Sequence, residues 1–208
     1  MWGGLPFSKT TSIEELEELP VGSAVHLEGK VTYSDVLGSR FWIQDETGAI
    51  AIPQSPNKAG VHAGDGVAID ATKASRYDPV QGPGSLLLAN LRIHSSSARV
   101  RLPQPIPVDF TNLPGPERNG MGIQMNVIVR DAHLDVYGRA HLNLSDFGSG
   151  IEAVVAEQGG ARYLGFVNSR VRIVGLSEQI VNASGERLSQ QIWVSSEHCT
   201  PPMVLDGC

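Results

Sequence analysis

One polar stripe in the first half of the chain carries the residue types best suited to binding a ligand. Between positions 40 and 44, Arg40, Trp42 and Gln44 alternate with two apolar residues. In a β-strand this alternation points the three polar side chains away from the core. An indole between a guanidinium and an amide forms a stacking platform for a base, a sugar or an aromatic ligand. We call these three residues the outward stripe.

Neighbouring segments extend this stripe. The period-two pattern of the preceding strand places Lys30 and Thr32 on the same outward side, and the loop over 73–85 adds further residues at its edge. A structural role is the alternative, because Trp42 could instead pack against the linker or the second half of the chain. The candidate ligand-binding residues are Lys30, Arg40, Trp42, Gln44, Arg76 and Tyr77.

The second half of the chain repeats this strand without its aromatic residue. The equivalent stripe is His141, Asn143 and Ser145, so the first half is the better candidate for binding through this face. A single histidine such as His141 is more often an ordinary surface residue than a ligand or a base.

The sequence gives no pattern typical of a catalytic or metal centre. It has no serine in a Gly-x-Ser-x-Gly elbow and no His-Glu-x-x-His pair. The carboxylates over 44–48 have a sufficient role in a tight turn. Cys199 and Cys208 are too few for a disulfide framework and too isolated for a zinc site, although they could pair with each other. We therefore expect a protein that is not an enzyme and has no cofactor and no metal.

Composition and charge narrow the class of protein. A hydrophobic content of 41% and a charged content of 18% are typical of a soluble globular chain. The net charge of -6 gives no overall attraction to phosphate backbones and counts against a general nucleic-acid binder. A net negative charge is still compatible with a local basic groove. No apolar run approaches a membrane span, and the first residues do not resemble a signal peptide.

An internal repeat organises these residues. Four short patterns recur in the same order about one hundred residues later, which indicates two copies of one strand-rich domain. Each copy has alternating strands, tight turns and a connecting segment, which is typical of a small Greek-key barrel. The first copies of the four patterns lie at 35–38, 41–50, 67–69 and 91–93, and the second copies at 135–138, 142–151, 171–173 and 192–194.

We therefore predict an all-β protein of two tandem OB-fold-like, five-stranded Greek-key barrels with short helices. Ser12 and Glu15 predict a capped helix before the first strand. The predicted core is Phe41, Ile43, Ile50, Val67 and Ile69, with Leu142, Leu144, Ile151, Val171 and Ile173 in the second copy. The predicted organisation is an N-terminal segment with the helix over 1–20, a first barrel over 21–95, a linker over 96–108, a second barrel over 109–199 and a tail over 200–208.

The sequence over 25–52, followed by Ala-Gly-Asp-Gly-Val-Ala-Ile-Asp at 63–70, resembles the OB-fold pattern. With the second copy, it resembles the tandem OB-fold regions in the extracytoplasmic part of some large bacterial sensor histidine kinases. The run over 169–175, Asn182 and the glutamine-rich strand at 190–194 follow in the order found there. No kinase, phosphoacceptor or ATP-binding segment is present.

The resemblance implies a non-catalytic sensory module of a bacterial signal-transduction protein, extracytoplasmic or periplasmic, with a cytoplasmic location as the alternative. Its partner would be a small ligand, a glycan or a protein, and the module could be tethered to a membrane in a longer protein. The alternative function is a single-stranded nucleic-acid-binding OB-fold protein that uses Arg40, Trp42, Arg76 and Tyr77. The acidic net charge makes nucleic acid the less favoured partner.

Overall fold

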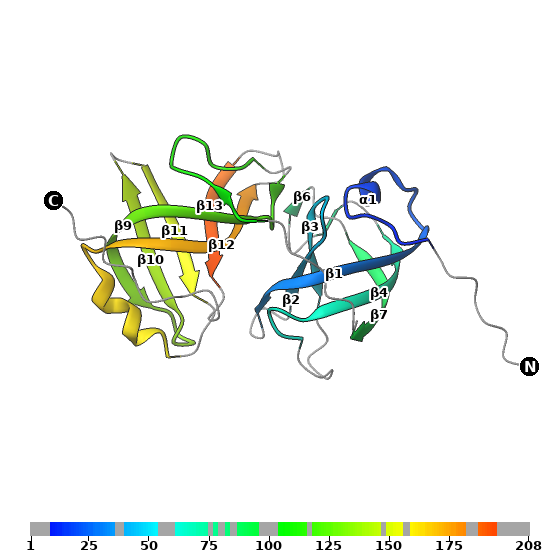
Figure 1. Cartoon of the computed structure of the whole chain (residues 1–208), viewed down its shortest axis with the longest axis horizontal. Coiled ribbons are helices and arrows are strands. Elements are labelled where there is room, and N and C mark those ends of the chain that lie inside the picture. The colour runs from blue at the N-terminus through cyan, green and yellow to red at the C-terminus, as the bar shows by residue number, and fades with distance from the viewer. Residues whose placement is uncertain are drawn as a thin grey trace, which may run out of the picture.

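The structure is a computed structural model that describes residues 9–35, 40–53, 61–74, 77–78, 82–83, 87–95, 104–115, 118–146, 149–155, 159–181 and 187–194. Two β-barrels lie side by side along the long axis of the molecule (Figure 1). Within the described ranges, no helix has the length and hydropathy needed to cross a membrane.

The first barrel is built from one antiparallel sheet with the strand order β3-β2-β1-β4-β7. Its inward side chains alternate along each strand and form a single apolar cluster. A two-stranded hairpin, β5 and β6, lies between β4 and β7 in the sequence. The strands are β1 (Ala24–Asp35), β2 (Arg40–Gln44), β3 (Ala49–Pro53), β4 (Gly66–Lys73), β5 (Tyr77–Asp78), β6 (Gly82–Pro83) and β7 (Leu88–Ser95).

A single-turn helix, α1 (Glu15–Glu18), precedes the first strand. The Ser12 backbone N–H donates to the Glu15 carboxylate at 3.1 Å, and the Glu15 N–H donates to the Ser12 hydroxyl at 3.3 Å. This is the reciprocal capping pattern that the sequence predicts. Ile13 and Leu16 are buried in the core of the first barrel, so the short helix is held by packing.

The second barrel is closed. Its sheet has the order β10-β11-β13-β12-β9-β8, and β10 also pairs with β9. Strands β11 and β13 run parallel, while the other strand pairs of the closed ring are antiparallel. The elements are β8 (Ile106–Pro107), β9 (Gly122–Leu134), β10 (Ala140–Asp146), β11 (Ser149–Val155), the 3-10 helix η2 (Gly160–Phe166), β12 (Arg170–Val181) and β13 (Arg187–Val194).

The predicted fold class is confirmed: the chain is all-β and consists of two OB-fold-like units of five main strands each. The second is a closed barrel, whereas the first is a half-barrel whose edge strands β3 and β7 do not pair within the described residues. The predicted core is confirmed as well, because all ten residues are buried. Much of the predicted linker over 96–108, the first eight residues and the C-terminal tail with both cysteines lie outside the described residues.

A β-bulge interrupts the first strand of each barrel. In β1 the pairing with β2 shifts between Val31 and Tyr33, and in β9 the pairing with β10 passes from Val129 to Asp131, skipping Arg130. A bulge inserts one residue and re-aims the side chains beyond it. Strict alternation would point Tyr33 into the first core, whereas the bulge turns it to the outer face, where it packs against the second barrel.

Candidate functional site

The outward stripe of the first barrel is buried between the two barrels. Trp42 leaves the core of its own barrel, as expected, yet only 6% of its surface is exposed. We use the name interface cluster for the buried residues of both barrels that surround it, which are Tyr33, Trp42, Ala51, Val154, Leu176 and Trp193. The expectation of an exposed stacking platform is therefore wrong, and the alternative that Trp42 packs against the second half of the chain is confirmed.

The backbone of the second barrel closely approaches the indole of Trp42. A Cβ atom added at Gly120 would lie 2.2 Å from two carbons of the ring, Cε3 and Cζ3. Gly120 also has a φ of +78°, a conformation that residues with a side chain rarely adopt. The contact therefore requires glycine for two separate reasons.

Arg40 is tied to the second barrel by a two-point ion pair. Its Nη1 and Nη2 donate to Oε1 and Oε2 of Glu178 at 2.9 and 3.0 Å. The same carboxylate accepts the Nε1–H of Trp193 at 2.6 Å, and the guanidinium lies 5.3 Å from the centre of the Trp193 ring. The side chains of Arg40 and Glu178 are only 18% and 15% exposed. Arg40 is thus engaged within the protein.

The remaining candidates of the first barrel do not restore a binding face. Gln44 is buried, which contradicts its expected exposure, and Lys30 is half-buried opposite Gln44 in the β1–β2 ladder. Arg76 and the side chain of Tyr77 lie outside the described residues. Alternation identified which side chains leave one barrel's core, but it carries no information about which barrel surfaces meet.

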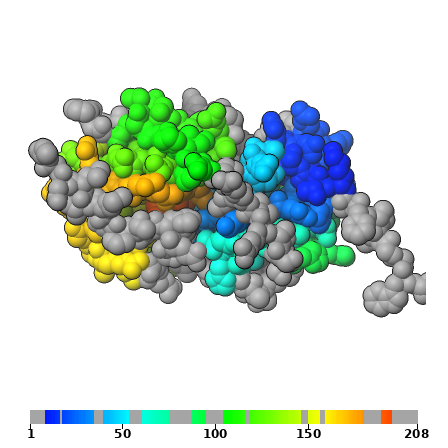
Figure 2. All heavy atoms as spheres, viewed as in Figure 1, coloured from blue at the N-terminus to red at the C-terminus, as the bar shows by residue number. Residues whose placement is uncertain are grey.

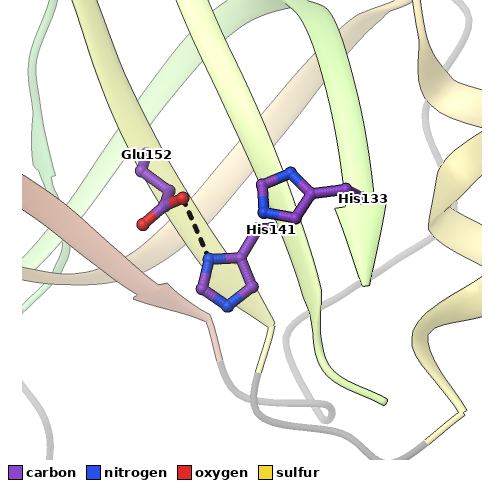
Figure 3. Close-up of side chains that lie close together, drawn as sticks. All are labelled: His133, His141 and Glu152. Atoms are coloured by element: carbon purple, nitrogen blue, oxygen red, sulfur yellow. Dashed lines mark ion pairs between the residues drawn. The ribbon is translucent and has the colours of Figure 1, made fainter. Parts of the chain in front are cut away.

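The equivalent face of the second barrel brings together ionisable residues from three strands. His133 of β9, His141 of β10 and Glu152 of β11 place their possible ligand atoms within 4.8 Å of one another. We call these residues the histidine cluster. His141 Nδ1 lies 2.9 Å from Glu152 Oε1, and the two imidazole rings stack with their centres 5.1 Å apart. Figure 3 shows the Glu152 carboxylate facing the His141 ring, with the His133 ring on a different side of the His141 ring.

The other ring nitrogen of His141 faces a second carboxylate. Nε2 of His141 lies 3.5 Å from Oδ2 of Asp135. Partial burial by itself would raise the pKa of Asp135, but hydrogen bonds from the Arg139 side chain and from the backbone N–H groups of Arg139 and Tyr137 outweigh burial and lower this pKa to about 2. Asp135 is therefore ionised at neutral pH and held in place beside the imidazole.

The sequence analysis named His141 and Asn143 on this face but missed the other members. Asn143 is exposed and lies between Asp131 and Glu152 in the paired strands. His133 and Glu152 have no sequence spacing that links them to His141. The one available signal was their position on adjacent strands of the predicted barrel, and the bulge in β9 obscures that signal because it changes which residues point outward.

A third feature of the second barrel is a basic surface on β9 and β12. Arg130 of β9 and Arg170 and Arg172 of β12 are exposed, and none has a carboxylate partner among the described residues. We call these three residues the arginine face. Both strands lie at the front of the second barrel in Figure 1, and atoms of β12, in orange, reach the surface in Figure 2.

Amide side chains adjoin the arginine face. Arg172 lies opposite Asn126 in the β9–β12 ladder, and its Nη2 donates to Oε1 of Gln124. Arg170 lies opposite Ile128. The binding face predicted from the sequence lies on the first barrel, which carries Trp42, and does not include the arginine face.

No known family model matches this chain, and no curated protein matches it. Among solved structures, it is similar to the HINa domain of Ifi202 in complex with 20-base-pair double-stranded DNA, with 11% identity, coverage of 66% of this chain and 79% of that chain, and a TM-score of 0.32. A murine DNA-binding protein bound to double-stranded DNA has 12% identity, coverage of 84% and 92%, and a TM-score of 0.35. A replication protein A heterotrimer bound to single-stranded DNA has 8% identity, coverage of 88% and 68%, and a TM-score of 0.28.

The interface between the barrels corrects the expected function. The stripe that was expected to hold the sensed ligand is closed between the barrels, so the interpretation of the chain as a module that senses a ligand through this stripe is wrong. The solved structures named above contain DNA, and at these identities and TM-scores they indicate a likeness of fold alone.

Proposed function

We propose that this chain is an OB-fold nucleic-acid-binding protein, and that the phosphate backbone of a single strand lies across the arginine face of the second barrel. The observation that carries the proposal is the set of three exposed arginines, none of which has a carboxylate partner within the described part of the chain. A guanidinium is suited to phosphate because it presents several N–H donors in a planar fork.

The spacing of the arginine face fits an extended, flexible strand. Arg170 and Arg172 are two residues apart on one strand and therefore about 7 Å apart on the same face. Arg130 lies one step beyond Ile128, the ladder partner of Arg170, so it continues this row diagonally onto the neighbouring strand. Gln124 and Asn126 add neutral donors beside the row. Half-buried Ile128 offers apolar surface between the charges.

Negative charges, near the arginine face and on the chain as a whole, limit the expected affinity for nucleic acid. Exposed Asp131 follows Arg130 directly at the bulge, and the whole chain has a net charge of -6. Binding should therefore fall in the range of weak phosphate-driven complexes, roughly 10⁻⁴ to 10⁻⁶ M at physiological salt. The interface tryptophans contribute no stacking in this arrangement, because both are buried.

Fluorescence anisotropy with labelled single-stranded DNA, RNA and duplex DNA tests the proposal. Three phosphate contacts predict a slope of about -2 for log K against log salt with single strands, since each contact contributes about -0.7. The affinity should therefore fall about 20-fold between 50 and 200 mM salt. The R170Q/R172Q variant should bind at least about tenfold more weakly, because two charge-assisted hydrogen bonds are lost.

A matched variant separates the arginine face from the overall charge. Lys9 and Arg92 are exposed on the first barrel, so K9Q/R92Q changes the net charge by the same amount as R170Q/R172Q. The proposal predicts that K9Q/R92Q retains nearly all of the affinity. Equal weakening in the two variants, or no salt-dependent binding by the unaltered chain, would overturn it.

A further inference from the structure

We propose that the histidine cluster of the second barrel binds a divalent transition-metal ion, and that Zn²⁺ is the ion that best fits its ligands. The proposal is independent of nucleic-acid binding, because it rests on His133, His141 and Glu152 and not on the arginine face. Two imidazoles and one carboxylate are a ligand set that Zn²⁺ accepts, whereas Mg²⁺ and Ca²⁺ prefer oxygen ligands alone.

The three side chains are close to the geometry that zinc requires. Zinc bonds of about 2.1 Å in a tetrahedral arrangement place ligand atoms about 3.4 Å apart. In the structure His141 Nδ1 and Glu152 Oε1 are 2.9 Å apart, and the ligand atoms of the whole cluster lie within 4.8 Å of one another. His133 is exposed, and the Glu152 side chain is 34% exposed. Both therefore have room to move, and the His133 ring must also rotate, because it stacks on the His141 ring whereas a metal lies in the plane of each imidazole that binds it.

Secondary contacts hold the ligands in the orientation that a metal needs. A metal-bound histidine usually donates its second ring N–H to a carboxylate, which fixes the tautomer. If Nδ1 of His141 faces the metal, Nε2 lies 3.5 Å from Oδ2 of Asp135, where it makes no hydrogen bond and would need a small movement to donate to this carboxylate. Gln191 Nε2 donates to Oε2 of Glu152 at 2.8 Å, which leaves Oε1 directed at His141.

The bulge in β9 is the backbone feature that completes the cluster. Before the bulge, the odd-numbered residues of β9 are buried in the core and the even-numbered ones, such as Arg130, face outward, and after it His133 lies directly opposite His141 in the β9–β10 ladder. Without the inserted residue, His133 would point to the opposite face of the sheet. Three protein ligands leave one position of a tetrahedral zinc open to water or to an oxygen of a bound molecule.

Isothermal titration of the full chain with Zn²⁺, in the presence of a thiol reductant, tests the proposal. We expect one zinc site with a dissociation constant in the micromolar range or below, and no heat from Mg²⁺ at the same concentration. His133→Gln and Glu152→Gln should each weaken zinc binding at least about tenfold, since even residues that only support a ligand contribute about 10- to 100-fold. His133 is exposed, so its replacement should leave folding intact.

Two controls decide between this cluster and other zinc ligands. His94 is an exposed histidine on β7 of the first barrel, and His94→Gln should leave zinc binding unchanged. A C199S/C208S variant should retain the site as well. Zinc affinity that is unchanged in His133→Gln, or that disappears only in C199S/C208S, would overturn the proposal, as would the absence of zinc binding by the unaltered chain. Zinc binding that persists in R170Q/R172Q shows that the site does not depend on the nucleic-acid proposal.

Discussion

Removing one partner of the ion pair between Arg40 and Glu178 should strongly destabilise the protein, because the pair lies in the interface between the barrels and the remaining charge would be left there unpaired. Arg40→Ala removes the guanidinium and leaves a Glu178 carboxylate that is 15% exposed and that, among the described residues, keeps one hydrogen bond, from Trp193. Breaking a buried pair by removing one partner costs about 3–5 kcal/mol. Because both side chains keep some exposure, we expect a value near 3 kcal/mol.

Urea denaturation followed by tryptophan fluorescence measures this loss. A destabilisation of about 3 kcal/mol corresponds to a decrease of about 6–12 °C in melting temperature for a chain of this size. Replacing both partners, as in R40M/E178M, should recover most of the loss, since apolar residues of similar volume often substitute for a buried pair at no cost. Arg92→Ala, at an exposed site without a carboxylate partner in the described structure, should change stability by less than about 0.5 kcal/mol.

A loss below about 1 kcal/mol for Arg40→Ala would refute this reasoning. That value is typical of solvent-exposed ion pairs, and it would mean that the two barrels do not exclude water from the pair. Failure of R40M/E178M to regain stability would instead show that the geometry of the ion pair, and not the unpaired Glu178 charge, determines the loss.

Three further changes test other parts of the structure. Gly120→Ala should destabilise the protein by about 1–3 kcal/mol more than Gly138→Ala in urea denaturation. Both glycines have a positive φ, but of the two only Gly120 contacts the Trp42 indole. Equal losses of unfolding free energy would contradict this contact. Ile43→Ala should cost about 2–5 kcal/mol of unfolding free energy, and a loss below about 1 kcal/mol would mean that Ile43 is not a core residue. The hydrogen bond that the His26 ring donates to the Asp70 carboxylate raises the pKa of His26 and lowers that of Asp70. Their pairing should therefore stabilise the protein fully between about pH 4 and pH 6.5 and less at pH values above and below. The difference in unfolding free energy between the unaltered chain and His26→Gln should decrease above pH 6.5. A difference that stays constant from pH 5.5 to pH 9 would contradict this pairing.

The core of each barrel could be predicted from the sequence because it depends on local alternation. Ile43 and Leu144 lie in short strands whose apolar residues recur at every second position, and both are fully buried. The same alternation correctly predicted that Trp42 leaves its own barrel core. The burial of Trp42 depends on Gly120 and Trp193, which are distant in sequence. No local sequence pattern predicts a contact between such distant residues.

The histidine cluster could not be predicted for a different reason. His133, His141 and Glu152 come from three strands, so their proximity depends on strand register. The bulge at Arg130 shifts that register by one residue, and a one-residue shift exchanges the two faces of a strand. The arginine face contains arginines alone, so the combination of an aromatic with polar residues that indicated a stacking platform in the first barrel does not indicate this face.

Chemical-shift mapping by NMR is the measurement that tests the proposed function most directly. The ¹⁵N-labelled chain would be titrated with a short single-stranded oligonucleotide at low salt. We predict that the largest shifts occur at 124–130 and 170–174, and that residues 40–44 remain unchanged because they are closed between the barrels. Shifts centred on 40–44, or no shifts at the arginine face, would contradict the account.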